Sequence, residues 1–103
     1  MIRHCVMLGL PDDHDAAELG NIMQGLGDLT EHLSGCGNFL AGANIDVEGK
    51  SSGFPFGFTI DFDDTAALQV YADHPEHKKL GARLVALCGG GGKITVFDLQ
   101  EYD

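Results

Sequence analysis

The segment FPFGFTIDF, residues 54–62, constrains the fold of this chain more than any other. Large apolar residues occupy every second position from Phe54 to Phe62, and Pro, Gly, Thr or Asp stands between them. Side chains alternate between the two faces of a β-strand, so the pattern predicts a strand with one face against a core. Pro55 has no backbone donor, which places the start of this strand at a sheet edge or outside the paired region.

A second alternating segment, IRHCVMLGL (2–10), is apolar on both faces, which is typical of a strand covered on both sides. Apolar residues at steps of three and four, Leu26 among them, predict a helix over 16–33. Three glycines weaken that helix, so we expect it to depend on close packing. The other expected elements are a strand over 38–47, a short helix over 63–72, a helix over 74–88 and a strand over 93–99.

This order of elements is β-α-β-β-α-β if the two adjacent helices count as one crossover. It predicts an α+β, ferredoxin-like fold in a single domain over 1–103: a four-stranded antiparallel sheet with its helices on one face. Cys5 and Met7 would then lie on the face without helices, together with apolar residues of the other strands. Since monomers rarely leave a large apolar patch in water, we expect a second copy to cover it and form a homodimer.

Charge and composition exclude several classes of protein. The chain carries 16 acidic and 6 basic residues, for a net charge of −10, and the basic residues are scattered. Nucleic acid and anionic membrane surfaces are therefore not expected partners. No apolar run approaches the ~18 residues of a membrane span, and the start of the chain lacks the pattern of a signal peptide, so the prediction is a cytoplasmic protein. Three widely spaced cysteines indicate neither a disulfide framework nor a zinc ribbon.

The segment DHPEHKKLGARL (73–84) raises the question of whether its histidines do chemistry. Asp73 and Glu76 have the spacing of a capping box, and a proline in the first turn suits a helix start, so His74 is interpreted as a capping or packing residue. HPEH also resembles a metal-binding pair, but a structural zinc needs four ligands, and neither a metal nor another cofactor is expected. The run GGGGK (89–93) precedes a strand and lacks the Ser or Thr of a phosphate loop, so it is interpreted as a connector.

His77 has a stronger case for chemistry, because other polar groups can converge on it. His4 lies on the face of its strand that should look toward the helices, and a buried imidazole needs a hydrogen-bond partner. Tyr71 and His77, on either side of the helix junction, are the expected partners. Two imidazoles and a phenol around an apolar cavity would be able to move a proton near neutral pH.

The chain resembles the stress-responsive A/B barrel domain (Dabb) family, a branch of the dimeric α+β barrels. The resemblance rests on IRHCVML, NIDVEGKSSGF, IDFDDTAALQVYADHPEH and ITVFDL, which span almost the whole chain in the family's order. It implies a homodimer whose two sheets face each other as a barrel. The chain departs from the family at residues 53–56, where Gly-Phe-Pro-Phe replaces Gly-Tyr-Thr-His, and in its glycine-rich CGGGG segment.

Some Dabb-like proteins are polyketide cyclases, which close a ring by intramolecular aldol condensation. The resemblance implies His4, Tyr71 and His77 as their catalytic residues here. The leading prediction is a small homodimeric protein of stress response or secondary metabolism that binds an apolar or aromatic molecule, with Phe56, His74 and Leu26 as further ligand contacts. The alternatives are an enzyme, either of polyketide-cyclase type or a cofactor-free monooxygenase, and a purely structural dimer whose core Phe56 closes.

Overall fold

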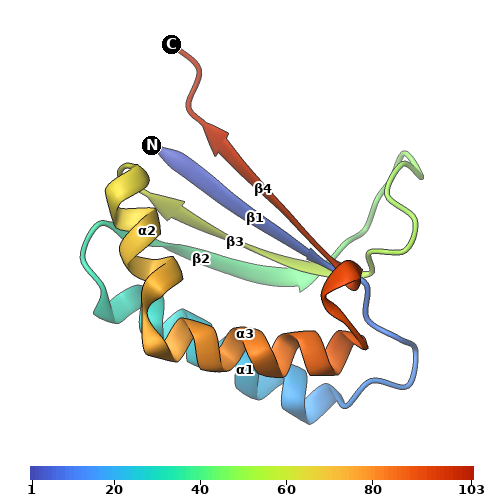
Figure 1. Ribbon diagram of the computed structural model, residues 1–103. Helices are drawn as coiled ribbons and strands as arrows, with labels where there is room; N and C mark the ends of the chain where they lie inside the picture. Colours follow the sequence, from blue (N-terminus) through green and yellow to red (C-terminus); the bar gives the residue numbers. More distant parts are fainter.

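The computed structural model describes all residues from Met1 to Asp103 and has the predicted ferredoxin-like fold (Figure 1). The sheet is antiparallel in the order β2-β3-β1-β4, and the helices lie together beneath one of its faces. No helix has the length and apolar character that crossing a membrane requires. The elements are β1 (Ile2–Leu8), α1 (Ala16–His32), β2 (Cys36–Ala43), β3 (Phe56–Phe62), α2 (Thr65–Asp73), α3 (Pro75–Cys88), a 3-10 turn η1 (Gly91–Lys93) and β4 (Ile94–Gln100).

The core lies between the helices and the even-numbered face of β1. Val6 is buried there and pairs with Phe58 of β3 on one side and with Val96 of β4 on the other. The apolar stripe of α1 is buried against the sheet, as its period predicts, and includes Leu26. This face of the sheet and the helices therefore form one continuous core.

The glycines of α1 have different surroundings. A Cβ atom at Gly25 would lie 2.9 Å from a Leu80 methyl group of α3, which is closer than real Cβ contacts. Gly25 therefore permits the close approach of α1 and α3, in agreement with the expected close packing. Gly20, by contrast, is exposed and has no neighbour within 4 Å of the position of a Cβ.

Strand β2 differs most from its prediction, because it spans Cys36–Ala43 instead of 38–47. The chain leaves the sheet at Asn44, whose side-chain amide donates to the Phe54 carbonyl at 2.9 Å. Asp46 then accepts backbone N–H groups of Lys50 and Ser51 at 2.9 and 2.7 Å. These side chains hydrogen-bond the backbone locally in place of a strand partner, so the apolar alternation of residues 44–47 does not produce a strand.

The start of α3 confirms the capping interpretation of His74 but not the capping box. His74 is the N-cap, and its Nδ1 accepts the Glu76 backbone N–H at 3.1 Å. The prediction of Asp73 as the capping residue is wrong: Asp73 ends α2, and its carboxylate accepts the side-chain amide of Gln69 at 3.0 Å. The adjacent helices leave only His74 between them, so the cap shifts by one residue.

The opposite face of the sheet carries no helix and exposes large apolar side chains. Phe97 and Leu99 of β4 are 56% and 59% exposed, and Leu40 of β2 is 64% exposed. Cys5 pairs with Phe97 in the register of β1 and β4, so both side chains lie on this face. We call it the open face; it is the apolar surface that the alternation of β1 predicts.

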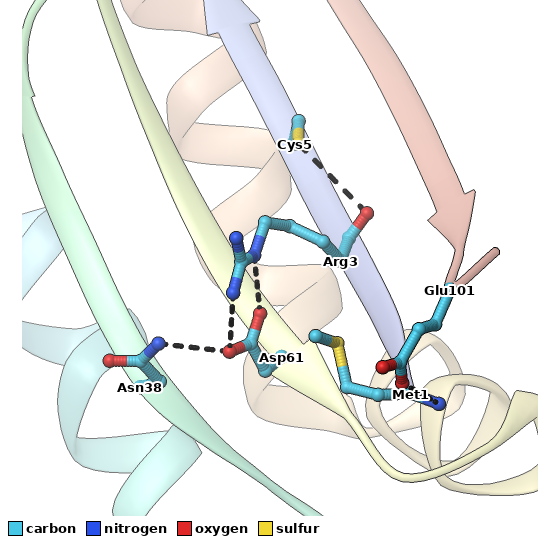
Figure 2. Close-up of polar contacts among 6 residues, drawn as sticks. All are labelled: Met1, Arg3, Cys5, Asn38, Asp61 and Glu101. Atoms are coloured by element: carbon cyan, nitrogen blue, oxygen red, sulfur yellow. Dashed lines mark hydrogen bonds and ion pairs between the residues drawn. The ribbon is translucent and has the colours of Figure 1, made fainter. Parts of the chain in front are cut away.

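The charges on the open face are paired with one another. Figure 2 shows the Arg3 guanidinium donating two hydrogen bonds to the Asp61 carboxylate, with nitrogen-to-oxygen distances of 2.7 and 3.0 Å. The Asn38 side-chain amide donates to the same carboxylate at 2.9 Å. The Arg3 guanidinium and the Asn38 amide lower the pKa of Asp61 to about 2. Just before the start of β1, the N-terminal ammonium of Met1 lies 3.5 Å from the Glu101 carboxylate. These pairs neutralise the face although the chain has a net charge of −10.

Candidate functional site

An apolar cavity of about 530 Å³ opens between α3 and the sheet at its β4 side. Helix α3 forms one wall, and β1, β3 and β4 form the other. Clefts beside the 44–55 loop and beside His74 are smaller, about 390 and 470 Å³, and few hydrophobic residues line them. The residues that line the apolar cavity are His4, Val6, Phe58, His77, Lys78, Gly81, Ala82, Leu84, Val85, Ile94 and Val96.

The size of the cavity follows from small residues on α3. Gly81 and Ala82 lie one turn after His77, and a Cβ atom at Gly81 would meet no atom within 4 Å. Binding pockets for small molecules are typically concave, mostly apolar and of several hundred Å³, and they have few polar groups. This cavity has those properties and two imidazoles on its wall.

His4 is buried at 9% exposure, and its hydrogen-bond partner is Asp98. The two residues face each other in the register of β1 and β4, and His4 Nδ1 lies 2.6 Å from Asp98 Oδ1. A carboxylate oxygen can only accept here, so Nδ1 carries the proton and Nε2 is the remaining nitrogen. Sequence reasoning expected Tyr71 or His77 to satisfy this imidazole; that prediction is wrong.

Tyr71 nevertheless lies between the two imidazoles. Its ring centroid is 5.8 Å from that of His4, edge-on, and 4.4 Å from that of His77. Its ring also packs on Phe62 at 5.2 Å, and such aromatic pairs each stabilise a fold by about 0.5–1.5 kcal/mol. The Tyr71 hydroxyl forms no hydrogen bond within the chain. Since every fully buried side-chain nitrogen or oxygen atom has a hydrogen-bond partner, this hydroxyl must keep some contact with solvent. Burial raises the pKa of Tyr71, so it remains a phenol.

His77 is held as a neutral imidazole with one free nitrogen. Its Nδ1 donates to the Ala72 carbonyl at 3.0 Å, which leaves Nε2 as an acceptor. Burial is the main cause that lowers the pKa of His77, and the nearby His4, His74 and Lys78 lower it further, against the effect of the Ala72 carbonyl. In the unfolded chain His77 has the ordinary imidazole pKa of about 6.5, so it binds a proton at a higher pH than in the folded chain. Acidification through about pH 6.5 therefore destabilises the fold.

The structure brings the rings of His4, Tyr71 and His77 together, but only the two histidines line the cavity; Tyr71 packs behind them. The other predicted ligand contacts lie elsewhere. Phe56 is partly buried against the core and does not line the cavity. Leu26 is a core residue at 2% exposure. His74 caps α3 and lines the separate cleft of about 470 Å³. None of these last three side chains contacts the cavity in this structure.

This arrangement is suited to acid–base chemistry. A neutral imidazole with a free Nε2 can accept a proton, and a phenol can donate a hydrogen bond to a developing oxyanion. The Asp98 carboxylate orients His4 through its contact with Nδ1. The three thiols are not activated, because burial raises the pKa of Cys5, Cys36 and Cys88. No three His, Cys, Asp or Glu side chains are arranged to hold a metal ion.

Sequence reasoning missed two residues of the site, Asp98 and Gly81. Asp98 is the only charged residue within the segment ITVFDL, and a lone carboxylate in an apolar strand is a signal that it has a partner. The identity of that partner depends on the register between β1 and β4, which cannot be predicted from the sequence alone. Gly81 is significant only because no other side chain fills the space beside it.

Comparison with known proteins agrees with this architecture. A dimeric ferredoxin-like protein of unknown function from Jannaschia sp. CCS1 is 39% identical, with a TM-score of 0.91 over 97% of this chain and 98% of that chain. A Dabb family protein from Mesorhizobium loti is 25% identical, with a TM-score of 0.76 over 99% and 97%. A hydroxynitrile lyase from Passiflora edulis shares the fold at 18% identity, with a TM-score of 0.81 over 99% and 95%.

No curated protein matches the chain in sequence. The family model of the stress responsive A/B barrel domain, however, matches residues 2–101, nearly the whole chain. The resemblance that the sequence motifs carry is thereby confirmed. The chain belongs to the stress responsive A/B barrel domain (Dabb) family.

Proposed function

We propose that this protein binds a small apolar or aromatic molecule in the cavity between α3 and the sheet. The observation that carries the proposal is that both His4 and His77 stand on the wall of an apolar space of about 530 Å³. Most of the wall is apolar, so it favours a ligand with an apolar body. The free nitrogen of His77 gives that ligand one directional hydrogen bond. A purely structural dimer would have no use for such a space. A role in stress response or secondary metabolism follows from family resemblance alone.

We further propose that the working form is a homodimer joined through the open face. The exposed Leu40, Phe97 and Leu99 form an apolar surface there, and Arg3 and Asp61 neutralise each other within it. Two chains of charge −10 repel, so a neutral face is the one on which copies can meet. The relative from Jannaschia, 39% identical, is described as dimeric.

A second candidate function is acid–base catalysis of the polyketide-cyclase type at the same site. It is supported by the pair of His4 and Asp98 at 2.6 Å and by the Tyr71 ring, which packs against both imidazoles and whose hydroxyl has no partner within the chain. In an intramolecular aldol closure, His77 Nε2 would take a proton from an activated methylene carbon. That carbon would then attack a carbonyl of the same molecule, and Tyr71 would donate a hydrogen bond to the resulting alkoxide.

A thermal-shift screen of small aromatic molecules tests the binding function. Saturation at about 100 times Kd stabilises a fold by about 2.7 kcal/mol, which corresponds to a rise in Tm of roughly 10 °C for a domain of this size. We expect His77→Ala to lose most of this rise relative to its own ligand-free Tm. The matched control is His32→Ala, which changes an exposed histidine of α1 and should keep the full rise. If no compound raises the Tm of the wild-type protein, the result contradicts the binding function and favours the structural-dimer alternative.

A further inference from the structure

Lys78 is the one ammonium group on the wall of the apolar cavity. It follows His77 in the second turn of α3, beside Gly81 and Ala82, and its side chain is otherwise exposed. All other residues of the wall are apolar, small or imidazole-bearing. A lysine in this setting lays its methylene stem along apolar surface and keeps its charged end at the rim.

Lys78 has no carboxylate partner although acidic residues outnumber basic ones by 16 to 6. Arg3, Lys79 and Arg83 each form an ion pair, with Asp61, Glu76 and Glu18 respectively. Lys50 and Lys93 are also unpaired, but neither lines the cavity. The adjacent Lys79, one residue further along the same helix, is therefore bound to its own chain, whereas the Lys78 charge at the cavity is free.

Lys78 brings a positive charge to the cavity of a chain whose net charge is −10. Asp98 is the nearest acidic group facing His4, and its carboxylate is engaged by the imidazole at 2.6 Å. Lys78 is close enough to His77 that its positive charge disfavours protonation of that imidazole. A negative group entering from solvent would meet an unpaired ammonium and two imidazoles there.

We propose that the ligand of this cavity is a small aromatic carboxylate, whose anionic end is bound by Lys78 while its ring lies between α3 and β4. This proposal rests on the proposed binding function and specifies its ligand class. An anion at the rim would pair with the free ammonium group of Lys78, and the apolar wall holds the ring. Neutral aromatic molecules of the same shape would bind, but less tightly.

Calorimetric titration with naphthoate and naphthamide, substituted at the same ring position, separates charge from shape. We expect the wild-type protein to prefer naphthoate by about two- to fivefold at low ionic strength, the range typical of one partly exposed ion pair. Lys78→Met keeps the apolar stem and should abolish this preference, with the affinity for naphthamide unchanged within about twofold. Lys79→Met removes an equal charge one residue away and should leave both affinities as in the wild type.

The outcomes distinguish the two proposals. Equal wild-type affinities for naphthoate and naphthamide, unchanged by Lys78→Met, would overturn the anionic ligand and leave the aromatic-binding function standing. Equal losses in Lys78→Met and Lys79→Met would indicate a general charge effect and would also overturn it. Binding of neither probe would contradict the binding function itself, and the ligand class would fall with it.

Discussion

Phe97→Asp is expected to convert the proposed dimer into a monomer. The side chain is 56% exposed in the single chain and lies on the open face, midway along the edge strand β4, where it pairs with Cys5 of β1. A symmetric interface would bury two new carboxylates, one from each copy, between chains that already carry −10 each. Unpaired buried charges typically cost about 3–5 kcal/mol, so the dissociation constant should rise by roughly two orders of magnitude or more.

Sedimentation equilibrium at micromolar concentration measures this change directly. The control is Val70→Asp, because Val70 is 58% exposed but lies on α2, away from the open face. That variant adds the same charge and should remain dimeric. A wild-type protein that sediments as a monomer, or a Phe97→Asp variant that dimerises as tightly as the wild type, would contradict an interface on the open face.

Gly81→Phe is expected to abolish ligand binding while leaving the fold intact. A Cβ at Gly81 has open space around it, and the position lines the cavity, so a benzyl group would occupy the volume that we assign to the ligand. Replacing a helix-interior glycine also favours α3 by about 0.5 kcal/mol. We expect the affinity for an aromatic probe to fall by more than about thirtyfold, with unfolding temperature unchanged or raised.

The matched control for this variant is Gly20→Phe in α1. Gly20 also lies within a helix, is exposed and has free space at its Cβ position, but it is not part of the cavity. The same gain in helix propensity is expected there without a change in affinity. If Gly81→Phe binds the probe as the wild type does, the ligand occupies another site.

Local periodicity was sufficient to predict most of the architecture. The alternation of β1 and β3 and the stripe of α1 depend only on which residues are apolar, and each of these elements lies within two residues of its predicted bounds. Strand β2 was misplaced because Asn44 and Asp46 bond the backbone locally, and their effect outweighs an apolar pattern that is otherwise strand-like. Propensity alone does not weigh these two tendencies.

The site was predictable only in part, because its contacts depend on register. His4 and His77 could be grouped by the helix junction, and the structure brings their side chains to one cavity. The partner of His4 required knowledge that β4 pairs with β1 and that Asp98 faces position 4. The cavity is open beside Gly81 because this residue has no side chain, and the sequence pattern does not show which spaces the other side chains leave unfilled.

The measurement that tests the proposed site most directly is the pH titration of the histidine ring signals by NMR, with and without an aromatic carboxylate. We expect the pKa of His77 to lie clearly below the ordinary imidazole value of about 6.5, because burial disfavours its charged form. The signals of His77 and His4 should also move when the ligand is added. A His77 pKa at or above the ordinary value, together with ligand-induced shifts in neither His4 nor His77, would contradict the site.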